Sequence, residues 1–369
     1  MIYLDNAATT FPKPDCVIDA VCSFMRESGG NPGRGGHHLS RKSAEAVFNC
    51  RENMAAMIHA DNPERIIFTK NATEALNLAI KGSVSAGDEI IISSMEHNSV
   101  LRSAVSMEKR GVTVKIARAD TTGRVSSHAF EELITSRTRL ICVTHASNVV
   151  GTVNPIDEIC SIARKKGVLT LVDCAQTGGI LPIDVKNIDM AAFAGHKGLY
   201  GPFGTGALYI REGISLDTLI EGGTGSMSES ALMPLDLPDR FEAGTVNACG
   251  IAGLNEGIKF VMREGVYEKE RYLTTLLREE LSDIRGLKIL GTSDVGVVGM
   301  VFTSHDCVDI ASQLDSDFDI ASRAGLHCAP MAHRTLGTIS SGLLRLSPGY
   351  FNTKEDIYEA VRALKTILQ

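Results

Sequence analysis

Seven short apolar segments, separated by stretches of helical length, run through residues 65–210 and constrain the fold more than any other feature. Two parallel strands need a crossover of a dozen or more residues between them, usually a helix. The segments 74–82, 100–111 and 156–167 are such stretches, and each ends in glycine, which is typical of a helix C-terminus. The rhythm predicts a mostly parallel α/β sheet with ligands bound beyond the carboxyl ends of its strands. The strands are expected at 65–69, 89–93, 113–117, 139–146, 169–173, 190–194 and 205–210.

The pattern changes after residue 245, where longer helices and short strands take over. A long helix is expected at 266–284 and a last one at 353–368, where Thr353 and Asp356 resemble a capping box. The last part of the chain therefore predicts a smaller α+β domain. The expected division is a large domain at 15–249 and a small domain at 250–369, with residues 1–14 packing on the small domain or near the active site. Within the large domain, the glycine-rich stretch 29–36 is expected to be a loop.

Charge and cysteine usage exclude several classes of protein. The net charge is −7, whereas a nucleic-acid-binding protein needs a concentrated basic patch. The nine cysteines are scattered without a C-x-x-C pair, which argues against a disulfide framework and against a metal site. No signal peptide and no apolar run of about 18 residues are recognisable. We expect a cytoplasmic protein that binds neither nucleic acid nor a membrane.

The stretch "FAGHKGLYGPFG" places Lys197 between an apolar strand and a series of glycines. A strongly hydrated ammonium group gains nothing from such a position if it serves only as a surface charge. A lysine that forms a covalent bond to a ligand does need a fixed place at the end of a strand.

Polar groups follow other strands of the expected sheet. Asp173 comes directly after four strand residues, where it is either a helix N-cap or the partner of a buried cation or donor. The residues "NATE", starting at Asn71, either cap a helix or present backbone N–H groups to a phosphate, with the Thr73 hydroxyl as a further donor. His97 and Asn148 also follow strands, and each alone could be purely structural.

A strand-end lysine, a buried aspartate and a helix start suited to phosphate together match the needs of pyridoxal 5′-phosphate (PLP). The lysine forms a Schiff base, the aspartate keeps the pyridinium nitrogen protonated, and the helix start takes the phosphate. The combination predicts a PLP enzyme.

Seven motifs occur in order along the chain: "YLDNAATT", "NATEALN", "EHNSV", "VDCAQT", "GHKGLYGP", "RFEAGT" and "RAGLHCAP". They resemble the class V aminotransferase family and, within it, the second group of cysteine desulfurases. The resemblance implies PLP-dependent fold type I: a large domain with a mixed, mostly parallel seven-stranded sheet, a smaller α+β domain, and a homodimer.

The resemblance also implies a role for each matching residue. Lys197 would carry PLP, Asp173 would meet the ring nitrogen, His97 would stack on the ring, and Gln176 would reach its phenolic oxygen. Asn71, Ala72, Thr73 and His196 would hold the phosphate, together with Thr245 of the other subunit. Asn148, Arg323 and Arg345 would bind the substrate, and Cys328 would be the nucleophile, its thiolate favoured by Arg323 and His327.

One position departs from this pattern. Relatives usually carry a hydroxyl residue three positions before the lysine, where this chain has Ala194. We expect a weaker hold on the phosphate there.

The sequence thus predicts a PLP-dependent enzyme that converts L-cysteine to L-alanine and keeps the sulfur as a persulfide for an acceptor protein. Two alternatives remain open at this point. One is a selenocysteine lyase, which would act on L-selenocysteine, and the other is a low-turnover PLP-fold protein that binds a sulfur carrier.

Overall fold

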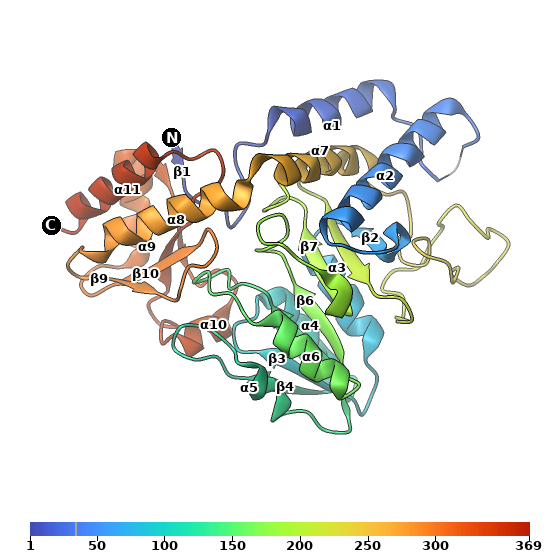
Figure 1. Cartoon of the computed structure of the whole chain (residues 1–369), viewed down its shortest axis with the longest axis horizontal. Coiled ribbons are helices and arrows are strands. Elements are labelled where there is room, and N and C mark those ends of the chain that lie inside the picture. The colour runs from blue at the N-terminus through green and yellow to red at the C-terminus, as the bar shows by residue number, and fades with distance from the viewer. Residues whose placement is uncertain (34) are drawn as a thin grey trace.

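The computed structural model describes residues 1–33 and 35–369, and a seven-stranded sheet forms the centre of its larger part (Figure 1). Strand β8 runs antiparallel to both of its neighbours, and the other pairs are parallel. The mixed, mostly parallel sheet is as predicted, and each strand overlaps a predicted segment. Across the sheet the order is β2 (Ile66–Thr69), β8 (Gly206–Ile210), β7 (Met190–Ala194), β6 (Leu169–Asp173), β5 (Thr138–Thr144), β3 (Glu89–Ser93) and β4 (Thr113–Ala117).

Helices cover both faces of this sheet, which explains why its strands are almost continuously apolar. Ile91 and Ile141 point into one core and their neighbours Ile90 and Leu140 into the other, since successive side chains of a strand alternate. The first core is completed by α2 (His38–Met57), α6 (Ile156–Lys165) and α7 (Ala248–Glu264), and the second by α3 (Ala72–Ser83) and α4 (Asn98–Glu108).

The predicted glycine ends are right for two of three helices. Gly111 and Gly167 follow α4 and α6 with positive φ. Gly82, however, lies inside α3, which continues to Ser83. A Cβ atom on Gly82 would stand 2.6 Å from the carbonyl oxygen of Asp217, so this glycine allows a close approach of two backbones.

The smaller part has its own sheet and core (Figure 1). The last helix begins with the predicted capping box of Thr353 and Asp356. Leu4 lies in this core, and the N-terminal strand pairs with a strand of the smaller part, so the first residues pack there. The elements are α8 (Val266–Ser282), α9 (Cys307–Phe318), α11 (Lys354–Ile367), the antiparallel sheet β12 (Arg323–Gly325), β13 (Leu343–Leu346), β10 (Val298–Phe302), β9 (Leu287–Leu290), and the parallel pair β1 (Ile2–Tyr3) and β11 (Ile320–Ala321).

The boundary between the two parts lies later than residue 250. Helix α7 packs against α1 (Asp15–Glu27) and α2, and its apolar side chains belong to a core of the larger part. The chain passes to the smaller part at Gly265, between α7 and α8. The short helices are α5 (Ser127–Glu131), α10 (Pro330–Thr335) and the 3-10 turns Pro63–Arg65 and Val185–Asn187.

Arg34, in the predicted loop 29–36, lies outside the described residues, and the rest of that stretch forms neither helix nor strand. Within the ranges 1–33 and 35–369, no helix is both long and apolar enough to cross a membrane.

Candidate active site

The candidate residues from the larger part gather at one edge of the sheet. Strands β2, β3, β5, β6 and β7 all point the same way, so their carboxyl ends meet at this edge. Beyond these ends lie, in chain order, Thr73, His97, Asn148, Asp173 and Lys197. Because they follow different strands, they reach one edge from segments far apart in the sequence.

Lys197 sits in a tight loop after β7. Gly198 allows this loop to pack closely, since a Cβ atom there would lie 2.6 Å from the carbonyl oxygen of Gly178. The Lys197 ammonium has no hydrogen-bond partner among the described residues, and burial lowers its pKa to about 8, against the opposing effect of Asp173. The amine therefore gives up its proton far more readily than an ordinary lysine.

Asp173, the last residue of β6, has one oxygen engaged and one available. Oδ1 accepts the backbone N–H of Ala175 at 2.9 Å, and Oδ2 accepts no hydrogen bond from the described residues. Burial raises the pKa of this carboxyl. A ring N–H⁺ placed at Oδ2 would stabilise the carboxylate by ion pairing.

The first turn of α3 is capped by side chains, yet two of its backbone N–H groups remain free in the part of the chain that the structure describes. The Asn71 side chain accepts the N–H of Glu74 at 2.9 Å, and Glu74 accepts the N–H of Lys70 at 2.6 Å. The N–H groups of Ala72 and Thr73 meet no acceptor among the described residues. Free N–H groups at the positive end of a helix suit a phosphate.

His97 caps α4, and Ser99 links it to Thr73. The His97 Nδ1 atom accepts the N–H of Ser99 at 3.1 Å, so the neutral ring carries its proton on Nε2. The Ser99 hydroxyl lies 2.8 Å from this Nδ1 and 2.8 Å from the Thr73 hydroxyl. Burial lowers the pKa of His97 to about 4, with the Lys197 charge adding to the effect. Sequence reasoning missed Ser99, although it stands two residues after His97.

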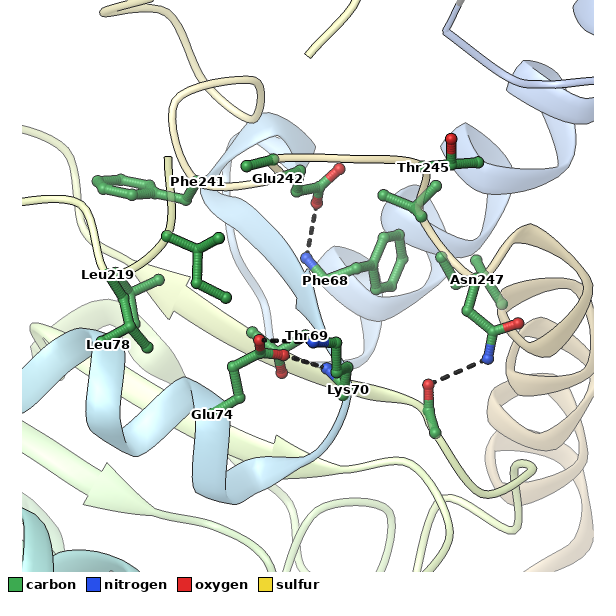
Figure 2. Close-up of a pocket in the computed structure, with 15 residues that line it drawn as sticks. Phe68, Thr69, Lys70, Glu74, Leu78, Leu219, Phe241, Glu242, Thr245 and Asn247 are labelled. Atoms are coloured by element: carbon green, nitrogen blue, oxygen red, sulfur yellow. Dashed lines mark hydrogen bonds and ion pairs between the residues drawn. The ribbon is translucent and has the colours of Figure 1, made fainter. Parts of the chain in front are cut away.

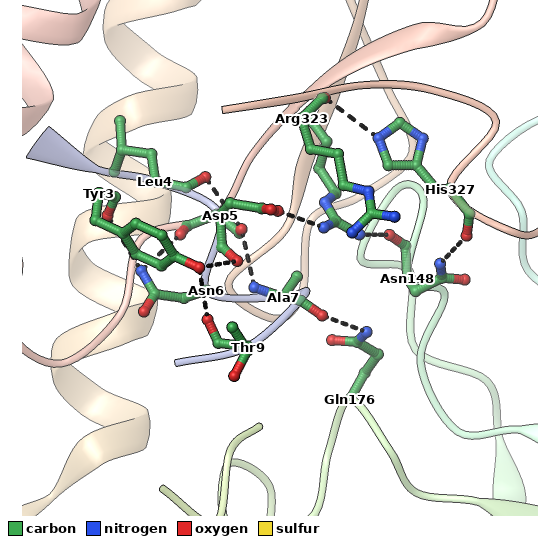
Figure 3. A network of polar contacts seen from close by, with 12 residues as sticks. Tyr3, Leu4, Asp5, Asn6, Ala7, Thr9, Asn148, Gln176, Arg323 and His327 are labelled. Atoms are coloured by element: carbon green, nitrogen blue, oxygen red, sulfur yellow. Dashed lines mark hydrogen bonds and ion pairs between the residues drawn. The ribbon is translucent and has the colours of Figure 1, made fainter. Parts of the chain in front are cut away.

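His196 has a buried Nδ1 atom without a partner among the described residues. Its carbonyl oxygen accepts the Lys13 ammonium at 2.8 Å, which ties the N-terminal segment to the lysine loop. Gln176 also contacts that segment, donating to the carbonyl oxygen of Ala7 at 3.1 Å (Figure 3).

Arg345 is almost fully buried and held by two partners. It donates to the carbonyl oxygen of Asn148 at 2.9 Å and to the carboxylate of Asp5 at 2.7 Å. Its Nε atom is buried without a partner in the described chain. Figure 3 shows Asp5 and Asn148 in one network with His327 and Arg323. A substrate carboxylate would have to exchange with Asp5, a residue that sequence reasoning did not single out.

The loop carrying Cys328 is fastened to this edge at two points. The Cys328 carbonyl accepts the N–H of Asn98 at 2.7 Å, and the His327 carbonyl accepts the Asn148 side chain at 2.8 Å. His327 and Cys328 have φ values of 49° and 55°, a conformation that costs energy for residues other than glycine. The thiol is exposed and presented next to the start of α4.

The expected electrostatic help from His327 is not supported. Burial lowers the pKa of His327 to about 3, so its ring is neutral and carries no charge to favour a thiolate. Arg323 is exposed and forms no ion pair with the described residues, so its charge remains available.

Thr245 is exposed on a separate surface pocket of about 260 Å³ (Figure 2). Lys70 and Glu74, at the start of α3, line the same pocket. The Thr245 hydroxyl accepts a 3.3 Å hydrogen bond from Asn31.

These groups fit PLP. In the described chain, each of four groups lacks a hydrogen-bond or bonding partner that the cofactor would supply. They are the second oxygen of Asp173, the N–H groups of Ala72 and Thr73, the ammonium of Lys197 and the Nδ1 atom of His196. Among the described residues, no group of three His, Cys, Asp or Glu side chains is placed to hold a metal ion.

Comparison with known proteins shows the family to which the chain belongs. The family model "Aminotransferase class-V" matches residues 2–359. The chain belongs to the class V aminotransferase family. The fold is that of the PLP enzymes of type I, and the predicted family is confirmed.

Members with a stated activity match along their whole length. The chain is 36% identical to a probable cysteine desulfurase of Methanothermobacter thermautotrophicus, over 96% of this chain and 92% of that protein. It is 36% identical to a cysteine desulfurase of Yersinia pestis, over 100% and 93%.

Solved structures agree. A cysteine desulfurase of Thermococcus onnurineus superposes with a TM-score of 0.92 at 30% identity, covering 100% of this chain and 94% of that one. The cysteine desulfurase CsdA of Escherichia coli superposes with a TM-score of 0.89 at 28% identity, covering 99% and 94%.

Proposed function

We propose that this protein is a PLP-dependent cysteine desulfurase that converts L-cysteine to L-alanine and takes the sulfur onto Cys328. The observation that carries the proposal is the exposed Cys328 thiol on a loop bonded to Asn98, the residue directly after His97. Full-length similarity to cysteine desulfurases supports the same reaction.

Six residues would hold the cofactor. Asp173 would take the ring nitrogen on its free oxygen, His97 would lie on the ring, and Lys197 would bind the aldehyde carbon. Ala72, Thr73 and His196 would take the phosphate. When bound, PLP supplies an electron sink that lets bonds around the α- and β-carbons of an amino acid break.

Side chains of the protein would bind the substrate, transfer protons and accept the sulfur. Arg345 and Asn148 would orient the substrate carboxylate after Asp5 has moved aside. The Lys197 amine, with its pKa lowered to about 8 by burial, can take and return a proton near neutral pH. The Cys328 thiolate would attack the substrate sulfur, so that a persulfide forms on the protein and alanine is the other product.

The test is the variant Cys328→Ser, compared with Cys22→Ser, which removes another exposed thiol far along the chain on α1. Cys328→Ser should keep the visible absorption of bound PLP and lose alanine production from cysteine by about a hundredfold or more, because the nucleophile is gone. Mass spectrometry should find a persulfide in the parent and in Cys22→Ser, and none in Cys328→Ser.

Alanine release from cysteine by Cys328→Ser at the parent rate would show that another group accepts the sulfur. The same assay with selenocysteine tests the substrate: full retention on selenocysteine alone would favour a selenocysteine lyase.

The active form would be a homodimer in which Thr245 reaches the phosphate of the partner's site. An exposed apolar segment supports an interface with a second copy: Ile220, Met227, Leu232 and Leu235 are between 47% and 80% exposed. A sulfur-acceptor protein would then take the persulfide sulfur from the exposed loop.

A further inference from the structure

A second carboxyl group lies behind the candidate site, on Glu96. This residue stands between the end of β3 and the start of α4, directly before the capping residue His97. It is fully buried, with 0% of its surface exposed. It has no place among the residues that would touch cofactor or substrate.

The Glu96 carboxyl accepts two hydrogen bonds, both through the same oxygen. Oε1 accepts the N–H of Thr144 at 2.9 Å and the hydroxyl of Ser93. Oε2 is buried and meets no partner in the described part of the chain. No lysine, arginine or histidine of that part forms an ion pair with Glu96. A buried carboxylate without a cation is costly, so burial favours the neutral acid against the opposing effect of these two hydrogen bonds.

The contacts of Glu96 link the two residues that would meet the PLP ring, Asp173 at its nitrogen and His97 on its face. Thr144 is the register partner of Asp173 in the β5–β6 pair. The carbonyl of Asp173 accepts the N–H of His145 at 3.0 Å. The side chain of Glu96 is therefore fixed to the strand beside Asp173, while its backbone leads directly into His97.

We propose that Glu96 is a positioning residue of the cofactor site, a neutral carboxylic acid that fixes His97 relative to Asp173, and that loss of its proton weakens PLP binding. The inference rests on PLP being the cofactor. The acid form needs no cation, and an anion there would stand next to the charge of Asp173. Repulsion between the two carboxylates would then displace Glu96 or Asp173, so that His97 is no longer fixed relative to Asp173.

Two further titratable groups near Glu96, Cys142 and His97, keep one charge state as the pH rises toward 8. Burial raises the pKa of Glu96 to about 8, and the charge of Asp173 on β6 adds to the rise against the Ser93 hydrogen bond. Cys142 on β5 stays neutral, because burial holds its pKa well above the ordinary value. His97 is already neutral. Near pH 8, therefore, Glu96 changes its charge while Cys142 and His97 do not.

The decisive variant is Glu96→Gln, which keeps the shape and neutrality of the acid but has no proton to lose. PLP release from purified holoprotein is measured by fluorescence between about pH 6.5 and 9.5. Parent and variant should agree near neutral pH. Above its pKa the parent should lose affinity by up to about tenfold per pH unit relative to Glu96→Gln, the limit for one coupled proton. Lys197 titrates in both proteins, so their ratio isolates Glu96.

Two further variants guard against a purely structural effect. Glu96→Ala should hold PLP more weakly at every pH, with the glutamine variant restoring parental retention near neutral pH. Glu270→Gln removes another fully buried carboxyl, in the smaller part, and should leave the pH dependence of PLP release unchanged. Infrared spectra of the purified proteins should show that each glutamine variant loses one protonated-carboxyl band.

Retention of PLP by the parent protein near neutral pH tests whether PLP is the cofactor, independently of the role of Glu96. The role of Glu96 is overturned if parent and Glu96→Gln release PLP with parallel pH curves. It is also overturned if Glu96→Ala retains PLP as well as Glu96→Gln does near neutral pH.

Discussion

The Ser99 hydroxyl lies within hydrogen-bond distance of two other groups of the site, the Thr73 hydroxyl and the His97 ring. The chain lacks a hydroxyl at Ala194, and Ser99 provides one at the start of α3 instead. Sequence reasoning found Lys197, because one lysine among glycines after a strand is a local signal. It could not pair Asp5 with Arg345, because 340 residues separate them and nothing local in the sequence indicates the contact.

At this scale we predict that Ser99→Ala releases PLP faster. The variant loses the hydroxyl contacts with Thr73 and His97, and losing one such hydrogen bond costs about 0.5–1.5 kcal/mol, which corresponds to about 2- to 10-fold in retention. PLP fluorescence during dialysis measures the rate. Ser106→Ala is the matched control on the same helix, since its hydroxyl bonds only the carbonyl of Ser103. Equal rates for Ser99→Ala and Ser106→Ala would contradict the role.

At the scale of elements, the seven strands could be predicted because each is a short apolar run bounded by polar residues or glycine. Helices α1 and α2 were not predicted, although Val47, Cys50 and Met54 of α2 are buried at helical spacing. The division expected at residue 250 falls inside α7, which is a long helix like those that follow it. Only its packing against α1 and α2 assigns it to the larger part.

The contact between α8 and the loop that carries Lys197 leads to a prediction about the stability of the protein. The Tyr200 hydroxyl donates to the buried carboxyl of Glu270 at 2.8 Å and accepts the N–H of Tyr350 at 2.7 Å. Burial raises the pKa of Glu270 to about 8 from an ordinary 4.5. Between these values the folded protein keeps a proton that the unfolded chain has lost, so stability falls as pH rises.

Glu270→Gln should therefore gain stability relative to the parent as pH rises from about 5 to 8, by up to about 1.4 kcal/mol per pH unit. Above that range the difference should level off, because the folded parent has then also lost the proton. Denaturant unfolding at three pH values measures this gain. A parent-to-variant difference that stays constant with pH would show that Glu270 is ionised in the folded state.

For the whole molecule, the candidate site draws on both parts of the chain. Lys197 and Asp173 come from the larger part, and Cys328 and Arg345 from the smaller one, while the N-terminal segment touches both through Asp5, Ala7 and Lys13. Long-range packing of this kind has no local sequence signal, and here the family motifs indicated it. We propose that the exposed apolar segment around Leu232 and Leu235 packs against a second copy of the chain.

The last prediction tests whether the site is shared between two copies. Lys197→Ala and Thr245→Ala subunits should each be impaired as homodimers, because one lacks the amine and the other the phosphate contact. In a hybrid dimer, a Thr245 that acts across the interface leaves one site with both lesions and the other with neither. The intact site should restore up to half of the parental alanine production per dimer. Verified hybrids with no more activity than the mean of the two homodimers would place Thr245 in the site of its own chain.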